Sequence, residues 1–244
     1  MQLRSLALAA LLATSFAAQA DTIALWDFNT FNCASPCATL PKPTQSANGG
    51  VLSGVGGATF SSAGGSGTGS ALNSSSYPNQ GTGNLTRGVQ FMIDTSGYTD
   101  LVLTFSQRNS NTASAWTTLQ YTVDGLNWLT ATTFKMASPA NPNNISFVDG
   151  LTYDFSGITA ANNNTDFGIR FLASFAPGTS AYAPTLTTGS YGASGTIRYD
   201  NVLLSGDAIP DVPVDPLPVP EPHTYALMLA GLATIGLLAR RRAR

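Results

Sequence analysis

The chain has 244 residues with a formal net charge of −2, and only 10% of its residues are charged. Residues 21–206 contain nine Asp, no Glu, four Arg and two Lys. A nucleic-acid-binding protein needs clustered Lys or Arg to neutralise phosphates, and this stretch has no such cluster. The composition therefore argues against a nucleic-acid partner.

The N-terminus has the organisation of a secretory signal peptide. Arg4 gives a charged start, residues 5–16 are mostly apolar, and Ala18-Gln19-Ala20 forms a small-residue cleavage site. We expect residues 1–20 to direct export through the Sec machinery and to be removed. Asp21 is then the first residue of an exported domain that extends to residue 206, a length that suits one globular unit.

The chain has two cysteines, Cys33 and Cys37. In an oxidising compartment a close pair is most simply a disulfide that pins a surface loop. A metal site would require more ligands, and a redox site usually has the C-x-x-C spacing. The sequence therefore predicts a structural disulfide.

Period-2 alternation predicts β-structure through the exported domain. Asp124-Gly125 is a hairpin turn signal, because both residue types tolerate a positive φ, and residues 158–164 are expected to form a short helical turn. We predict an all-β, two-sheet antiparallel sandwich of the jelly-roll type. The expected strands are 22–28, 89–93, 101–106, 119–123, 127–134, 152–155, 169–173 and 196–204.

Residues 46–83 are rich in Ser, Gly and Asn, including the run Gly64-Gly65-Ser66-Gly67-Thr68-Gly69. Repeated glycine gives high backbone entropy and little to bury. This stretch is predicted to be a long flexible loop with at most a short strand near residues 51–60. It is not a phosphate-binding loop, which would need Gly-Lys-Ser/Thr after a strand.

The exported domain lacks the residues of most catalytic sites. The only histidine is His223, near the C-terminus, so Ser-His-Asp, Cys-His and His-based zinc sites are excluded from it. A glycosidase needs two facing carboxylates, but Asp94, Asp124 and Asp149 all lie in turn sequences. We expect a protein that is not an enzyme. An Asp-dependent glycan hydrolase remains the alternative.

Aromatic residues in two polar loops suggest a second alternative, a lectin-like glycan-binding module. Trp116 lies in the loop 109–117, and Tyr182 and Tyr191 lie in the loop 176–194. An exposed ring surrounded by amides and hydroxyls suits the apolar face and polar edges of a sugar, and both loops are expected at one end of the sandwich. Trp116 also opens a strand, where it would only cover the end of the core.

A Pro-rich stretch, residues 207–218, is expected to form an extended linker. It leads to Val219-Pro220-Glu221-Pro222, an apolar run over 224–239 and the cluster Arg240, Arg241 and Arg242. As a helix this run of about 16 residues spans ~24 Å, slightly less than the ~30 Å of a hydrocarbon core. We expect one transmembrane helix with a cytoplasmic C-terminus, because the arginines favour that side.

This C-terminal arrangement resembles the PEP-CTERM sorting signal of Gram-negative bacteria that make exopolysaccharide. The tetrapeptide at 219–222, the spacing, Gly231 and Gly236 in the apolar run and the Arg-rich end all match within about the last 26 residues. The resemblance implies removal of the tail by an exosortase-type protease after a transient stay in the inner membrane. It also implies a final place in the cell envelope or in an exopolysaccharide matrix. An ordinary single-span anchor is the alternative.

The stretch from Val89 to Leu204 is similar to jelly-roll ectodomains of bacterial surface proteins, which in turn are similar to carbohydrate-binding modules. That resemblance implies a structural calcium between Asp27 and Asp200, the only cofactor the sequence suggests. Alternatively, both residues cap strand ends or pair with Arg198 or Arg170. The resemblance lies in the following segments: Gly97-Tyr98-Thr99-Asp100-Leu101, Phe105-Ser106-Gln107-Arg108, Gln120-Tyr121-Thr122-Val123-Asp124-Gly125 and Arg198-Tyr199-Asp200-Asn201-Val202.

Overall fold

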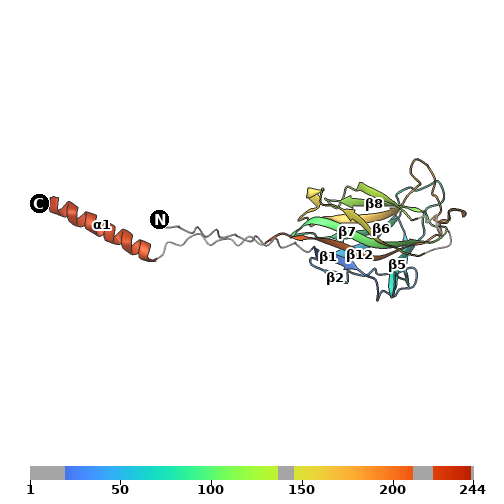
Figure 1. Ribbon diagram of the computed structural model, residues 1–244, viewed down its shortest axis with the longest axis horizontal. Helices are drawn as coiled ribbons and strands as arrows, with labels where there is room; N and C mark the ends of the chain where they lie inside the picture. The colour runs from blue at the N-terminus through green and yellow to red at the C-terminus, as the bar shows by residue number, and fades with distance from the viewer. Residues whose placement is uncertain (1–19, 137–145, 211–221, 243–244) are drawn as a thin grey trace, which may run out of the picture. The chain divides into compact units, whose positions relative to one another are not determined.

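The computed structural model describes residues 20–136, 146–210 and 222–242 (Figure 1). The chain divides into two compact units, one ending at Ile209 and the other beginning at Pro210. The first unit is a β-sandwich and the second contains one helix. The predicted signal peptide lies outside the described residues, except for Ala20.

The first unit consists of two antiparallel sheets that pack face to face, which confirms the predicted fold class. Within the described residues one sheet has seven strands, in the order β10-β7-β12-β1-β2 with β5 beside β12 and β4 beside β5; the other has five, in the order β3-β6-β11-β8-β9. The strands of the larger sheet are β1 Asp21–Trp26, β2 Gln45–Ser46, β4 Thr59–Gly64, β5 Ser70–Ser75, β7 Tyr98–Asn109, β10 Val148–Asp154 and β12 Ile197–Ala208. Those of the smaller sheet are β3 Gly50–Val55, β6 Gly88–Ile93, β8 Trp116–Thr122, β9 Leu129–Lys135 and β11 Gly168–Ala173.

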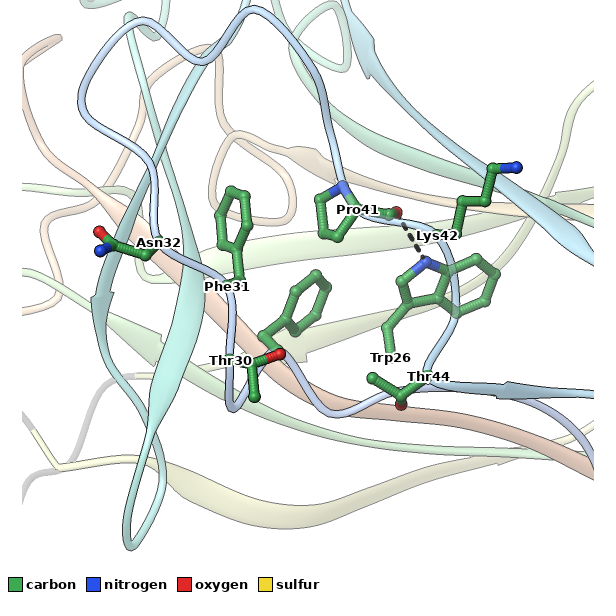
Figure 2. Close-up of a pocket in the computed structure, with 8 residues that line it drawn as sticks. Trp26, Thr30, Phe31, Asn32, Pro41, Lys42 and Thr44 are labelled. Atoms are coloured by element: carbon green, nitrogen blue, oxygen red, sulfur yellow. Dashed lines mark hydrogen bonds between the residues drawn. The ribbon is translucent and has the colours of Figure 1, made fainter.

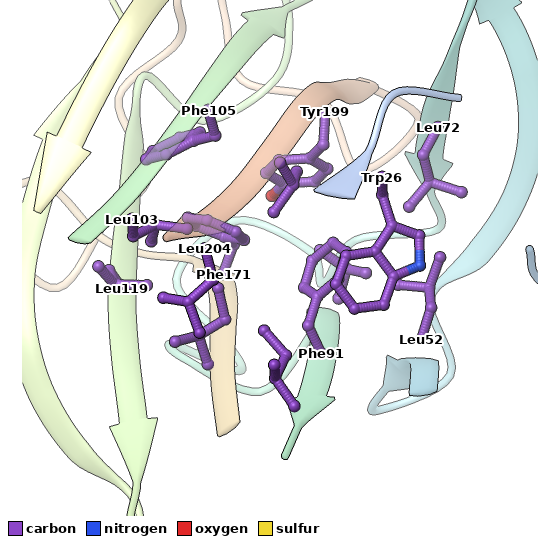
Figure 3. Close-up of a cluster of buried hydrophobic side chains, with 14 of the residues drawn as sticks. Trp26, Leu52, Leu72, Phe91, Leu103, Phe105, Leu119, Phe171, Tyr199 and Leu204 are labelled. Carbon is purple, nitrogen blue, oxygen red and sulfur yellow. The ribbon is translucent and has the colours of Figure 1, made fainter. Parts of the chain in front are cut away.

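Large aromatic side chains fill the space between the sheets (Figure 3). Alternation along each strand sends every second residue inward, so Phe91 on β6 and Phe171 on β11 meet edge to face with ring centroids 6.1 Å apart. Phe171 also stacks on Tyr199 at 5.2 Å and lies 4.6 Å from Phe105. Aromatic packing of this kind contributes beyond the buried area alone.

The predicted hairpin turn is confirmed between β8 and β9. Gly125 has φ +71°, and the Asp124 carboxylate accepts hydrogen bonds from the backbone N–H groups of Leu126 (2.9 Å) and Asn127 (2.7 Å). Hydrogen bonds to Asn127 hold the pKa of Asp124 well below its usual range. The expected helical turn is also present, as a 3-10 turn over Thr159–Ala161.

The prediction of a long flexible loop over residues 46–83 is wrong. This stretch contains β3, β4 and β5 and the second residue of β2. Leu52, Phe60 and Leu72 point into the core and are at most 8% exposed. β4 pairs with β5 over six residues, and β5 pairs with β12 over three. The prediction fails because few residues of this stretch are large and apolar, so its strands have no clear hydrophobic alternation.

The last strand ends later than predicted. β12 runs to Ala208, two residues beyond the expected domain boundary at residue 206, because it continues its pairing with β7 up to Tyr98. The backbone N–H of Ile209 then donates to the carbonyl of Gly97 (2.8 Å). The expected linker, 207–218, therefore begins with strand residues, and its portion from residue 211 onward lies outside the described residues.

The second unit contains the helix α1, Pro222–Arg242, over the region where the sequence predicts one. The prediction that it spans a membrane is not met: in the described part of the chain, no helix is both long enough and apolar enough to cross one.

Candidate functional site

The predicted sorting signal falls partly on described residues. Val219, Pro220 and Glu221 lie outside them, whereas Pro222 begins α1. Arg240, Arg241 and Arg242 occupy its last turn. Cations are favoured at this end of a helix, because the C-terminal carbonyls carry partial negative charge. The basic end of the signal is thus also a favourable helix terminus.

The predicted disulfide between Cys33 and Cys37 is present. The backbone N–H of Cys33 donates to the Ser62 hydroxyl (3.0 Å), and that of Cys37 donates to the carbonyl of Phe60 (2.9 Å). Both partners belong to β4. The loop that follows β1 is therefore closed on itself and hydrogen-bonded to a strand of the larger sheet.

A cavity of about 270 Å³ opens between this loop and the end of β1 (Figure 2). Trp26 and Phe28 lie at its base and are 0% and 2% exposed. The indole N–H of Trp26 donates to the carbonyl of Pro41 (3.2 Å), which ties the two segments together. Phe28 has φ +51°, a strained conformation for a bulky residue. We call this cavity the Trp26 pocket.

Polar groups surround the mouth of the Trp26 pocket. Thr30 and Asn32 follow Phe28, and Lys42 and Thr44 follow Pro41. The Thr44 hydroxyl donates to the carbonyl of Leu25 (2.9 Å) and is already engaged. Sequence reasoning missed this site, although the alternation of Trp26, Asp27 and Phe28 before a Cys-closed loop was visible. The full lining consists of Trp26, Phe28, Thr30, Phe31, Asn32, Pro41, Lys42 and Thr44.

The two loops predicted to carry sugar-binding aromatics lie side by side. The backbone N–H of Ala115 donates to the carbonyl of Ala183 (2.7 Å), and that of Thr185 donates to the carbonyl of Ala113 (2.9 Å). We call this region, residues 109–117 with 176–194, the paired loops. The expectation that they share one end of the sandwich agrees with these contacts.

Tyr182 does not fit the exposed platform that the sequence suggested. It is only 2% exposed, and its hydroxyl donates to the carbonyl of Gly83 (2.8 Å). Tyr191 stacks on it at 4.4 Å and donates to the carbonyl of Pro78 (2.7 Å). Burial raises the pKa of Tyr182 to about 12. Because both rings satisfy their hydroxyls internally, we correct this pair to a structural one.

Trp116 is half-buried at the start of β8, with the Lys135 ammonium 5.4 Å from its ring centroid. Residues 117, 119 and 121 alternate toward the core, so Trp116 lies on the outer face of the five-stranded sheet. On that face Trp128 stacks against the guanidinium of Arg170 at 4.3 Å. The two tryptophans thus belong to one surface.

On the same face a row of polar side chains crosses three strands in register. Gln90 on β6 pairs with Arg170 on β11, which pairs with Gln120 on β8. The Arg170 guanidinium donates to the Gln120 side-chain carbonyl (2.8 Å), and Gln120 donates to Thr130 on β9 (3.3 Å). We call Gln90, Arg170, Gln120 and Trp128 the outer-face row. Planar amides, a guanidinium and an indole at one level form a surface suited to hydrogen bonding and stacking.

The structure brings Asp27 and Asp200 close enough to interact. Asp200 is 1% exposed, and burial raises its pKa to about 6, with further contributions from the charges of Asp27 and Asp149. Its two carboxylate oxygens accept the backbone N–H groups of Asn201 (2.8 Å) and Ser66 (2.7 Å). A buried carboxylate thus lies beside two others.

The glycine-rich run folds directly over this carboxylate. A Cβ on Gly65 would lie 2.7 Å from an Asp200 oxygen, so only glycine fits there. The Ser66 hydroxyl then donates to Asp149 (2.6 Å). The run that sequence composition marked as flexible is therefore part of the site around Asp200.

The alternative pairing with arginine is not observed among the described residues. Arg198 donates to the carbonyl of Gly64 (3.1 Å) and to Asn73 (3.4 Å), whereas Arg170 belongs to the outer-face row. Asp27 accepts the backbone N–H of Asn29 (3.1 Å), as a residue that caps a strand end does.

The donor set for a metal ion is small. In residues 20–136, 146–210 and 222–242 no group of three or more His, Cys, Asp or Glu could hold a metal ion. Calcium takes six to eight oxygen ligands. Two carboxylates supply at most four, so a calcium at Asp27 and Asp200 would also need backbone carbonyls and water.

Of the three carboxylates that the sequence places in turns, Asp94 and Asp124 serve them. Asp149 instead lies in strand β10 and accepts a hydrogen bond from the Ser66 hydroxyl. Asp154 serves a turn that the sequence did not predict. Asp94 accepts the backbone N–H of Ser96 (2.9 Å), and Asp154 accepts that of Ser156 (2.8 Å). Hydrogen bonding to Ser156 lowers the pKa of Asp154. These carboxylates hold local backbone conformation, a role that leaves them poorly suited to proton transfer.

Comparisons with known proteins support the sorting signal. The model of the PEP-CTERM protein-sorting motif matches residues 218–242, which confirms the resemblance of the C-terminus. No curated protein matches the chain. The match covers the C-terminal segment alone, so it describes the signal and leaves the sandwich unassigned.

Similar solved structures include carbohydrate-binding modules. The CBM22-1-CBM22-2 tandem of Xyn10C from Paenibacillus barcinonensis is 15% identical to this chain, with a TM-score of 0.44. The match covers 81% of this chain and about half (52%) of the tandem. CBM28, described as specific for non-crystalline cellulose, is 12% identical to this chain, with a TM-score of 0.40. That match covers 64% of this chain and 88% of the CBM28 chain.

Proposed function

We propose that this protein is exported, sorted through its PEP-CTERM signal and deposited at the cell envelope or in an exopolysaccharide matrix, where it acts without catalysis. The observation that carries the proposal is the match to the sorting motif over residues 218–242. An exosortase-type protease is the processing partner that such a motif implies. The turn roles of Asp94, Asp124 and Asp154 support a non-catalytic domain.

Replacement of Pro220 and Glu221 by alanine tests this proposal in the producing cell. We expect the variant to remain unprocessed in the cell fraction, whereas the wild-type sandwich reaches the medium or matrix. Asp215→Ala, which lies outside the matched segment, is the control and should behave as wild type. Equal release and equal size of all three proteins on an immunoblot would contradict the role of the motif.

A second candidate function is glycan binding on the outer face of the five-stranded sheet. The outer-face row supports it: a 2.8 Å hydrogen bond joins Arg170 to Gln120, and the Arg170 guanidinium lies over the Trp128 ring, 4.3 Å from its centroid. A preorganised row of this kind can stack on the apolar face of a sugar and hydrogen-bond its hydroxyls. Trp116 extends the same face toward the start of β8.

Glycan-array binding by the secreted protein tests this second candidate. We expect Trp128→Ala to weaken binding by more than ten-fold and Trp116→Ala to weaken it less. Leu126→Ala, an 82% exposed residue in the neighbouring turn, is the control and should have no effect. Binding that survives both tryptophan substitutions would reject the outer face as the site, and release of reducing sugar would favour the hydrolase alternative.

We also propose that Asp27 and Asp200 share a structural calcium. Two neighbouring carboxylates supply hard oxygen ligands, which suit a hard cation, and a cation would offset the repulsion among Asp27, Asp149 and Asp200. Such a calcium ion would stabilise the folded sandwich, and a chelator should reverse that effect.

A further inference from the structure

The Trp26 pocket is held in shape by its own backbone. The N–H of Phe31 donates to the carbonyl of Phe28 (2.8 Å), and that of Thr44 donates to the carbonyl of Leu25 (2.7 Å). The Cys33–Cys37 disulfide lies within the loop that joins these two segments. A ligand therefore meets a cavity that already exists, and binding costs little ordering of the protein.

The shape and lining of the pocket suit one small ring. Its volume, about 270 Å³, is just below the roughly 300–1,000 Å³ of drug-sized sites, so it fits one sugar unit better than a chain. The rings of Phe31 and Pro41 both line the pocket, and in Figure 2 the Pro41 ring lies nearer the indole of Trp26. Apolar rings at the base and amide and hydroxyl groups at the mouth match the apolar face and polar edges of a pyranose.

Lys42 brings a positive charge to this mouth. It is exposed, and within the described residues its ammonium makes no ion pair or hydrogen bond. In Figure 2 the Lys42 side chain extends away from the indole of Trp26 and from the ring of Pro41. Its four-carbon stem is flexible, so it can turn over the opening when an anionic group is present. The Lys42 charge, which pairs with no described residue, is therefore available to a ligand carboxylate.

We propose that the Trp26 pocket binds the terminal sugar acid of an acidic polysaccharide. The pyranose ring packs against Phe31 and Pro41, Asn32 contacts its hydroxyls, and Lys42 pairs with its carboxylate. This inference rests on the proposed place of the protein at the cell surface or in the matrix, where such chain ends occur. It is separate from the outer-face row, which lies on the other sheet.

Calorimetric titration of the secreted protein with D-glucuronate and with D-glucose tests the inference. We expect measurable binding of glucuronate and binding of glucose weaker by about five-fold or more, the order expected of one exposed ion pair. Lys42→Gln should remove that difference while leaving glucose binding unchanged. Lys135→Gln, the other lysine of the sandwich, is the control and should retain the difference. Salt should weaken glucuronate binding to the wild type and to Lys135→Gln, which both keep Lys42, but not to Lys42→Gln.

Two further variants separate loss of binding from loss of folding. Phe31→Leu keeps an apolar side chain but removes the aromatic ring. The melting temperature should therefore change little, while glucuronate binding should fall at least five-fold. Leu126→Ala, an exposed residue in a turn of the other sheet, should leave glucuronate binding intact. Absence of glucuronate binding, equal affinity for the two sugars, or no effect of Lys42→Gln would overturn the inference. None of these outcomes affects the sorting proposal, whose test is the fate of the C-terminus.

Discussion

The Trp26 pocket and the paired loops are both aromatic-rich loop regions, yet they differ in what their polar groups contact. In the paired loops the hydroxyls of Tyr182 and Tyr191 donate to backbone carbonyls and the rings stack on each other. In the Trp26 pocket the rings line an open cavity, and Lys42 has no partner among the described residues. An aromatic loop is a candidate binding site when its polar groups have no partner within the protein. It has a structural role when those groups already form hydrogen bonds within the protein.

The largest expected effect concerns the paired loops. Tyr182→Ala should lower the free energy of unfolding by about 3 kcal/mol, because it removes a buried ring and leaves the carbonyl of Gly83 without its donor. Phe31→Ala in the Trp26 pocket should cost about 1 kcal/mol or less, since that ring is only half-buried. Urea unfolding measures both. Equal costs would remove the distinction between the two regions.

Removal of the disulfide tests how firmly the Trp26 pocket is held. Replacing Cys33 and Cys37 by serine should lower the free energy of unfolding by about 2 kcal/mol or less, because the closed loop is very short. The paired loops contain no cysteine and should keep their structure. Chemical denaturation gives the value, and thiol titration of the unreduced wild type should find no free thiol. Two free thiols in the exported protein would refute the bridge.

Calcium should stabilise the sandwich through Asp27 and Asp200. At 5 mM calcium and pH 7.5 we expect a gain of about 1.5 kcal/mol, if affinity is that of extracellular calcium modules. Chelation should reverse the gain, and Asp200→Asn should abolish the response without unfolding the protein. Asp166→Asn, an exposed carboxylate elsewhere, is the control. A melting curve unaffected by calcium and chelator would leave both residues as strand-end groups.

Acidification of the metal-free protein should change its stability less than calcium does. Burial raises the pKa of Asp200 to about 6. Because the folded state binds this proton more tightly than the unfolded state, protonation of Asp200 increases the free energy of unfolding. The gain is complete below the unfolded pKa of about 4 and is lost as the pH rises through 6. With chelator present, the melting temperature should rise by about 2–4 °C from pH 7.5 to pH 5. Asp200→Asn should flatten this dependence. A melting temperature that falls over the same interval would contradict the assignment.

The lowered pKa values of Asp124 and Asp154 do not interfere with that measurement. Their hydrogen bonds contribute stability above the unfolded pKa, which is lost only as pH falls below about 4. Between pH 5 and 7.5 these two groups remain charged in both states. The interval therefore isolates the contribution of Asp200 from that of the turns.

Local sequence patterns predict most strands of the sandwich but not those built from small residues. The alternation around Leu101, Leu119 and Ile169 reports burial directly, because each large residue faces the core. In the stretch 46–83, buried positions are filled by Ala71 and Ser74 as well as by Leu72, so hydropathy does not show the period. This stretch forms strands because β5 pairs with β12, which lies more than 120 residues further along the chain.

The candidate sites depend on contacts that no local pattern contains. Sequence reasoning placed Asp27 near Asp200 only through resemblance, and the N–H of Ser66 that reaches Asp200 comes from a run that composition marked as flexible. The outer-face row needs the register of three strands. By contrast, the sorting signal is contiguous and was recognisable from its residues alone.

The fate of the two ends of the chain tests the central claim most directly. Intact mass spectrometry of the protein recovered from the medium or matrix should show a chain that begins at Asp21 and lacks the residues after about Pro222. The unprocessed form should be found only in cells that lack the processing protease. Recovery of extracellular protein that still carries Arg240 to Arg244 would contradict the account.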